Sequence, residues 1–232
     1  MKNLLVPSLL LLLLSACSQP SSNDNSSAEA QTAKHPEFIQ NILDFYNFDN
    51  WNKVEQVSFD FVVERGDKKR VRDWKWDVPT GMVMLIENGD TVLFNTHAVD
   101  TADERELIAD QKFINDKYWT LFPFQLAWDS TATINHLGDL TSLMDSAKAY
   151  PAFEIVYPAA GGYTPGDKYV VLYDTSGRLT EWHYFPAGTD SPAMVTSWDK
   201  INGEVIKITP FHRVMNSETL IYNSYFHTTT KK

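Results

Sequence analysis

The stretch MVMLIENGDTVLFN, from Met82 to Asn95, decides the fold that the sequence predicts. Its two apolar runs, residues 82–87 and 91–95, flank the tripeptide Asn88-Gly89-Asp90. An Asn-Gly pair between apolar runs is a strong local signal for a β-hairpin. The stretch therefore predicts two antiparallel strands joined by a tight turn.

Two segments before this hairpin alternate apolar and polar residues, which is typical of half-buried strands. Residues 57–64 alternate, and so do residues 70–78, where Trp74 and Trp76 share one face and Asp77 lies on the other. The Gly-Asp-Lys sequence at 66–68 suits a turn between them. Together with the hairpin, these segments predict a four-stranded antiparallel meander.

Two other segments show helical spacing. Residues 36–46 place their apolar side chains on one face, and Pro36 suits a first helical turn. A second helix is expected over residues 102–115, with acidic residues in the first turn, where the helix dipole favours them. The side of this helix that we expect to be buried consists of Leu107, Ile108, Gln111 and Ile114.

The densest aromatic stretch of the chain follows, from Tyr118 to Asp129. Pro123 disfavours a helical conformation at Phe122, because the proline ring clashes with the backbone of the preceding residue. We expect a second short helical segment here, followed by irregular aromatic structure.

Weaker strand signals fill the second half of the chain, around a loop expected at residues 161–167. They lie at 131–137, 152–157, 168–174, 178–185, 193–200, 204–209 and 218–227. About ten strands with two or three helices before and between them predict an α+β fold, with a large antiparallel sheet and helices on one face.

The N-terminus predicts export. An apolar run from Leu4 to Leu14 follows Lys2, and it has signal-peptide length rather than the ~20 residues of a membrane span. The sequence Leu14-Ser15-Ala16-Cys17 resembles the lipobox of bacterial lipoproteins, which implies removal of residues 1–16 and lipidation of Cys17. Ser18, where an aspartate would retain the protein at the inner membrane, favours the outer membrane. The alternative is an ordinary signal peptide with a chance cysteine.

Composition sets further limits. Residues 17–34 would be the lipidated cysteine and a polar, disordered tether, and residues 35–232 would form one domain. The net charge of −10 argues against nucleic acid and against adhesion to anionic lipid as partners. Because Cys17 is the only cysteine, stability must come from a packed core, which the 7 tryptophans can supply.

Several motifs resemble a family of uncharacterised lipoproteins of Bacteroidetes-type bacteria. They are Trp74-Lys75-Trp76-Asp77, FINDKYW at 113–119, Pro123-Phe124, TPGDKY at 164–169 and Glu181-Trp182. The order of elements also resembles the LolA/LolB-like architecture of outer-membrane lipoprotein sorting. That resemblance implies a large curved antiparallel sheet, an open half-barrel, over residues 35–232. Helices would lid it, and its concave face would hold acyl chains. No functional residue of that family matches a position of this chain.

A set of aromatic residues is the candidate wall or lid of a cavity for a lipid or other apolar ligand. The set is Trp74, Trp76, Tyr118, Trp119, Phe122, Phe124, Trp128 and Trp182. The alternative is that these side chains only fill a core. Asp116 and Asp129 suit either a carboxylate pair for acid–base chemistry or hydrogen bonds to nearby backbone.

The motifs indicate neither a metal site nor a cofactor. The six histidines lack the spacing of metal ligands, and Ser197-Trp198-Asp199-Lys200 matches S-x-x-K without its companion motifs. We therefore expect a non-enzymatic protein, anchored on the periplasmic face of the outer membrane, that binds or carries a lipid. The alternatives are a hydrolase whose site is assembled from several strands, and a partner-binding accessory lipoprotein without a cavity.

Overall fold

The computed structural model describes residues 35–160 and 165–231. Contacts within the chain separate Met1–Lys34 from His35–Lys232. The expected signal peptide, Cys17 and the tether lie outside the described residues, as do residues 161–164 of the expected loop.

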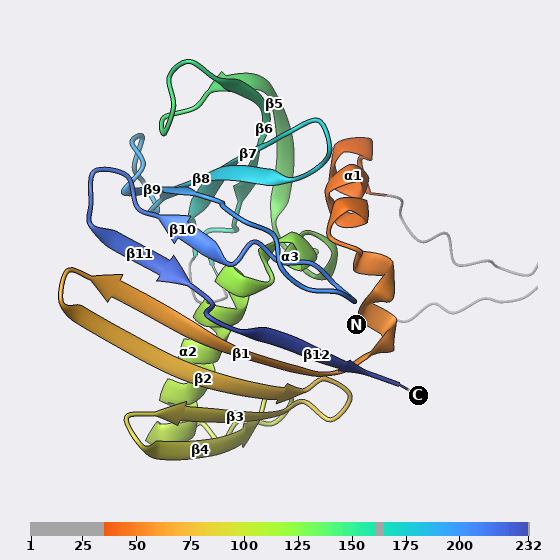
Figure 1. Ribbon diagram of the computed structural model, residues 1–232, viewed down its shortest axis with the longest axis vertical. Coiled ribbons are helices and arrows are strands. Elements are labelled where there is room, and N and C mark those ends of the chain that lie inside the picture. The colour runs from red at the N-terminus through yellow and green to blue at the C-terminus, as the bar shows by residue number, and fades with distance from the viewer. Residues whose placement is uncertain (1–34, 161–164, 232) are drawn as a thin grey trace, which may run out of the picture. The chain divides into compact units, whose positions relative to one another are not determined.

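The predicted meander is confirmed, and it belongs to a seven-stranded antiparallel sheet (Figure 1). Its strands are β1 (Val54–Arg65), β2 (Lys68–Asp77), β3 (Met82–Glu87), β4 (Asp90–Asn95), β10 (Phe211–Arg213), β11 (Thr219–Tyr222) and β12 (Phe226–Thr230). The order is β10-β11-β1-β2-β3-β4, and β12 also pairs with β1. At the predicted turn, Asn88 and Gly89 have φ angles of 54° and 82°, which this residue pair accepts at little cost.

A five-stranded antiparallel sheet contains the strands of the second half in the order β5-β6-β7-β8-β9. They are β5 (Thr133–Thr141), β6 (Ala149–Val156), β7 (Lys168–Tyr173), β8 (Leu179–Phe185) and β9 (Met194–Ser197). Isolated bridges from Thr196 to Val214 and from Asp199 to Phe211 connect the end of this sheet to β10. The described residues therefore form twelve strands, arranged so that one sheet continues into the other.

The helices are α1 (Glu37–Phe45), the 3-10 helix η1 (Phe48–Lys53), α2 (Glu104–Thr120) and α3 (Phe122–Trp128). The predicted first helix is confirmed, because α1 buries Ile39, Ile42 and Leu43. Helix α2 begins after Asp103, whose carboxylate accepts hydrogen bonds from the first backbone N–H groups of the helix. This N-cap places the first turn of α2 at the acidic residues, as the sequence predicted.

The predicted buried side of α2 is wrong. Its buried residues include Ala109, Phe113 and Trp119, whereas Ile108 keeps 42% of its surface exposed. None of the four predicted residues, Leu107, Ile108, Gln111 and Ile114, is among the buried residues of the helix. The helix instead extends to Thr120 and turns the FINDKYW aromatics toward the sheets.

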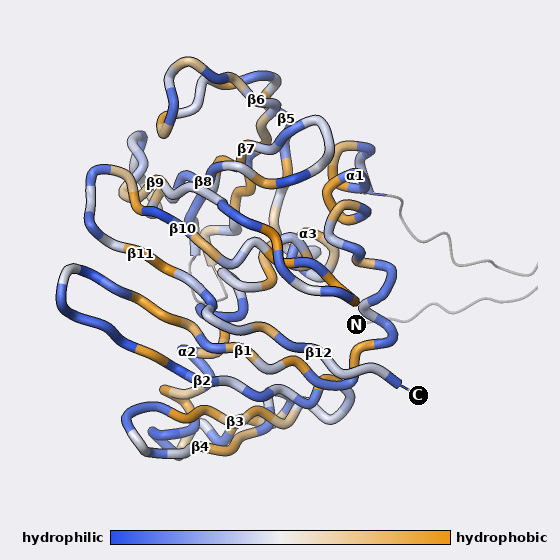
Figure 2. Tube along the Cα trace, in the orientation of Figure 1, coloured by the Kyte–Doolittle hydropathy of each residue, from blue (hydrophilic) through white to orange (hydrophobic). Residues whose placement is uncertain are grey.

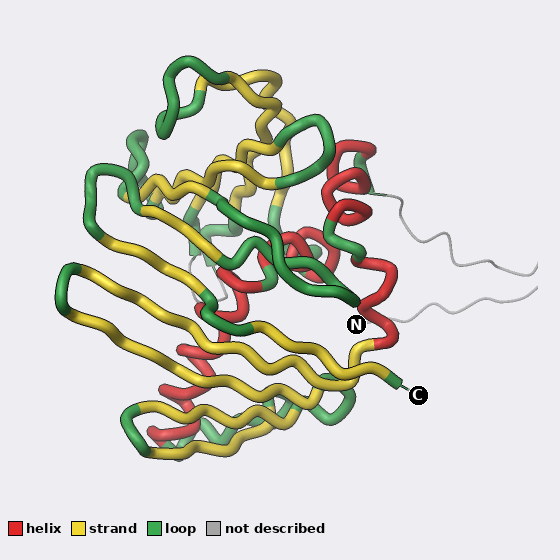
Figure 3. Tube along the Cα trace, in the orientation of Figure 1, coloured by secondary structure: helices red, strands yellow, loops and turns green. Residues whose placement is uncertain are grey.

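Three strand and loop predictions also need correction. The aromatic stretch is not irregular after Phe122, because Pro123 occupies the first turn of α3, where its missing N–H costs nothing. Residues 204–209 form part of the long loop between β9 and β10, which Figure 3 shows in green, rather than a strand. The predicted last strand, 218–227, is divided into β11 and β12 because the Asp60 carboxylate binds the intervening backbone at Ser224 and Tyr225.

The fold is α+β, as predicted. Its antiparallel sheets have β4 as the edge strand on one side and β5 as the edge strand on the other. Helix α2 crosses the inner face of the seven-stranded sheet, which is the face that carries Trp74 and Trp76 (Figure 1). The ring of Phe113 lies 5.3 Å from the ring of Trp74 and 5.6 Å from that of Trp76. One hydrophobic core joins α1, α2, α3 and the inner faces of both sheets.

Strand β3 is hydrophobic over almost its whole length (Figure 2). Val83 and Leu85 face the core, whereas Met82 and Ile86 lie on the outer face and stay 40% and 38% exposed. Among the described helices, we find none that is both long and apolar enough to cross a membrane.

Candidate functional site

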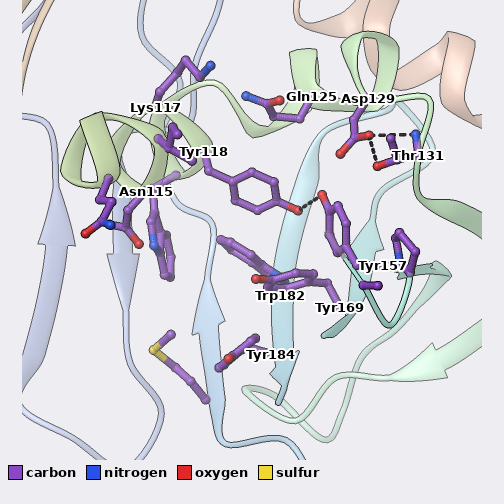
Figure 4. Close-up of a pocket in the computed structure, with 16 residues that line it drawn as sticks. Asn115, Lys117, Tyr118, Gln125, Asp129, Thr131, Tyr157, Tyr169, Trp182 and Tyr184 are labelled. Atoms are coloured by element: carbon purple, nitrogen blue, oxygen red, sulfur yellow. Dashed lines mark hydrogen bonds between the residues drawn. The ribbon is translucent and has the colours of Figure 1, made fainter. Parts of the chain in front are cut away.

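A pocket of about 620 Å³ lies between the C-terminal half of α2, the helix α3 and the inner face of the five-stranded sheet (Figure 4). Apolar and aromatic side chains form most of its wall, and amides and one carboxylate lie among them. The lining residues are Gln111, Ile114, Asn115, Lys117, Tyr118, Trp119, Gln125, Asp129, Thr131, Tyr157, Pro158, Ala160, Tyr169, Trp182, Tyr184 and Met194. Its volume lies within the range of about 300–1,000 Å³ that is typical of small-molecule sites.

Strand alternation explains which side chains reach this pocket. In β8, Trp182 and Tyr184 share one face and point inward, while Glu181 and His183 share the other. In β7, Tyr169 also faces the pocket. The sheet thus contributes a continuous aromatic surface.

The aromatic surface is held together by ring contacts. The Trp182 ring lies 4.4 Å from the Trp119 ring of α2 and 4.9 Å from the Tyr169 ring. The rings of Tyr169 and Tyr184 are 5.3 Å apart. Such offset and tilted pairs each contribute about 0.5–1.5 kcal/mol beyond burial, so these contacts stabilise the wall.

Two phenols meet at one side of the pocket. The hydroxyl oxygens of Tyr118 and Tyr157 are 2.8 Å apart, and Figure 4 shows the two rings directed at each other. Burial raises the pKa of Tyr157 to about 12, although its hydrogen bond with Tyr118 lowers it and the Asp129 carboxylate raises it further. Burial also raises the pKa of Tyr118, well above its ordinary value. Both phenols are therefore neutral at physiological pH.

Asp129 directly follows α3. Its carboxylate accepts hydrogen bonds from the backbone N–H and the hydroxyl of Thr131, at 2.8 and 2.6 Å. These bonds hold the carboxylate at the pocket beside Tyr157 (Figure 4). Asp129 therefore hydrogen-bonds the surrounding backbone, which is the second of the two roles expected for it.

Asp116, the other acid of the predicted pair, has a different role. It is fully buried away from the pocket lining, where it accepts two hydrogen bonds from Arg72 at 2.6 Å each and one from Trp74 Nε1 at 2.8 Å. It fixes α2 to β2, and it is not an acid–base partner of Asp129.

The eight aromatic candidates fall into three groups. Tyr118, Trp119 and Trp182 line the pocket. Phe122 lies directly behind this wall, stacked on Trp182 at 5.2 Å with an interplanar angle of 18°. The other four, Trp74, Trp76, Phe124 and Trp128, are outside the lining and pack in the core around Phe113 or Trp51.

Sequence reasoning missed Tyr157, Tyr169, Tyr184 and Met194 as lining residues. Tyr169 lies in KYVVLY, a run that is apolar on both faces, so the period of two could not tell the inner face from the outer. For Tyr184 the signal was present, because it alternates with His183 and shares a face with Trp182.

A polar cluster on the outer face of β8 does not have the arrangement of a hydrolase site. The Glu181 carboxylate contacts His183 Nε2 at 2.6 Å and also accepts a hydrogen bond from Ser142. The carboxylate thus lies between the other two groups, whereas a nucleophile needs the histidine beside it. Glu181 also accepts a hydrogen bond from the backbone of Leu143 at 2.8 Å, so the cluster holds the β5–β6 hairpin. Across the described residues, no group of three or more His, Cys, Asp or Glu side chains could hold a metal ion.

Comparison with known proteins gives no match to a family model or to a curated protein. Among solved structures, the chain is similar to a LolA superfamily protein from Nitrosomonas europaea, with 9% identity, coverage of 84% of this chain and 94% of that one, and a TM-score of 0.48. It is also similar to a DUF1329 family protein from Desulfovibrio piger, with 9% identity, coverage of 82% and 91%, and a TM-score of 0.46. A putative outer membrane lipoprotein-sorting protein domain from Vibrio parahaemolyticus has 10% identity, coverage of 84% and 93%, and a TM-score of 0.45. At such identities the matches concern the course of the backbone, and they assign neither a ligand nor a site residue to this chain.

Proposed function

We propose that this protein binds a lipid or another apolar ligand in the pocket between α2, α3 and the five-stranded sheet. The observation that carries the proposal is a pocket of about 620 Å³ whose wall is built from the rings of Tyr118, Trp119, Tyr169 and Trp182. Burial of apolar ligand surface against such a wall contributes about 25 cal/mol per Å². The protein is, on this proposal, a carrier or receptor and not an enzyme.

The proposal includes a membrane anchor. Lipidation of Cys17 would place the pocket close to a source of lipid. We also propose the periplasmic face of the outer membrane as its location. The motif resemblance to lipoproteins of Bacteroidetes-type bacteria belongs to the same proposal.

Native mass spectrometry tests the binding directly. The chain from position 17 to Lys232, carrying Cys17→Ser so that it remains unacylated, would be expressed in a bacterium and purified without detergent. We expect a population heavier by the mass of one lipid, which organic extraction removes. Protein of the bare polypeptide mass, together with failure to bind an added uncharged fluorescent lipid, would reject the carrier and leave the accessory role.

A further inference from the structure

Few charged side chains line the pocket, and they differ in whether their charged group points into it. Of the sixteen described lining residues, only Lys117 is basic and only Asp129 is acidic. A ligand with an ionised head would therefore depend on how these two groups are directed.

The Lys117 amino group is directed away from the pocket (Figure 4). Its Nζ lies over the rings of Trp76 and Phe113, 5.7 and 5.6 Å from their centroids, on the side of the seven-stranded sheet. Burial lowers the pKa of Lys117 from its ordinary value, although the nearby Asp110 carboxylate raises it. A carboxylate or phosphate head in the pocket would thus meet no directed cation among the described lining residues.

The part of the pocket wall beside Tyr157 carries the negative charge of Asp129. Asp129 is held at the pocket by Thr131, and the phenols of Tyr118 and Tyr157 are neutral donors and acceptors. An anion placed beside Tyr157 would be repelled by Asp129, and the repulsion is strong because an apolar wall screens charge poorly.

The wall nevertheless offers hydrogen bonds. The hydroxyls of Tyr118 and Tyr157 and the amide of Gln125 lie at the pocket. An acceptor oxygen on the ligand can take a hydrogen bond from these groups. A hydroxyl or ester can do so without bringing a charge beside Asp129.

From this arrangement we infer that the pocket selects ligands whose polar group is uncharged, such as an alcohol or an acylglycerol, and excludes those with an anionic head. This selectivity rests on the proposed lipid-binding function and assigns its ligand class. Asp129 is the residue that enforces it.

The test compares dodecanol with dodecanoate, which differ only in the head. At pH 7.5 the dodecanoate carboxyl is ionised, because its ordinary pKa lies about three units lower. Both compounds displace an uncharged fluorescent probe from the chain 17–232 carrying Cys17→Ser. We expect dodecanoate to bind at least about tenfold more weakly. Equal or tighter binding of dodecanoate would overturn the inference alone, whereas binding of neither compound nor probe would overturn the proposed function as well.

A matched pair of variants separates the effect of Asp129 from the general cost of burying an ion. Asp129→Asn keeps an oxygen that accepts from Thr131 but removes the charge, so the ratio of dodecanol affinity to dodecanoate affinity should fall severalfold. The control is Asp145→Asn, which removes an exposed carboxylate that pairs with Lys148 far along the β5–β6 hairpin. It should change neither affinity. An unchanged preference in Asp129→Asn that still binds dodecanol would show that Asp129 does not set the selectivity.

Discussion

Phe122→Ala tests whether the aromatic stretch is a loose lid or a packed support for the pocket. Phe122 has no exposed surface and contacts the rings of Trp182, Tyr118 and Trp198 at 5.2, 5.4 and 5.4 Å. A buried Phe→Ala change costs about 3–5 kcal/mol in transfer free energy and cavity formation. The site leaves little room for collapse, because rings surround it on three sides, so we expect the upper half of that range.

The melting temperature gives the readout. For a domain of 150–250 residues, each kcal/mol shifts the midpoint by about 2–4 °C, so a loss of about 4–5 kcal/mol lowers the midpoint by about 8–20 °C. Phe226→Ala in β12 is the matched control, because that ring is only half-buried, and its loss should be clearly smaller. A Phe122→Ala protein that melts within about 2 °C of the wild type would refute the packed support and return the stretch to a mobile lid.

Arg72→Leu should cost about 3–5 kcal/mol in urea unfolding, because it leaves the buried carboxylate of Asp116 without its ion-pair partner, whereas Lys69→Leu at an exposed position of β2 should cost far less. Burial lowers the pKa of His212 to about 4 in the folded protein, whereas an unfolded histidine has a pKa of about 6.5. Between these two pH values the unfolded chain binds a proton at His212 and the folded protein does not. Stability should therefore fall between pH 6.5 and 4 by up to about 1.4 kcal/mol per unit, and a His212→Gln variant with the same slope would contradict this. Cys17→Ser should abolish incorporation of labelled fatty acid and release the protein from membranes, and unchanged membrane retention would argue against the anchor.

Local signals predicted the elements best where one pattern dominated. The Asn88-Gly89 turn and the alternation around Trp74 fixed the meander, and the spacing of Ile39, Ile42 and Leu43 fixed α1. Prediction failed where tertiary contacts decide the outcome. The Arg72–Asp116 ion pair, which fixes α2 to β2, joins two residues that are 44 positions apart in the sequence.

The site was predicted only in part, because a pocket is a property of several elements. The sequence identified Tyr118 and Trp119 by aromatic density and also named Trp182 as a candidate, and these three residues do line one wall. It could not separate them from Trp74 or Phe124, which are equally aromatic but pack in the core. The distinction depends on which rings border the space between α2 and the five-stranded sheet, and that space exists only once these elements have packed.

The measurement that tests the central claim most directly is binding of an uncharged fluorescent lipid to a variant whose pocket is filled. Met194 in β9 lines the pocket and is half-buried, so Met194→Trp would place an indole in the space that the ligand needs. Ile86→Trp is the matched control, because Ile86 lies on the outer face of β3 and is 38% exposed. With both variants folded, as judged by thermal melting, we predict that Met194→Trp weakens binding at least about tenfold while Ile86→Trp binds like the wild type. Equal affinity of the two variants would contradict the account, because the lipid would then bind somewhere other than this pocket.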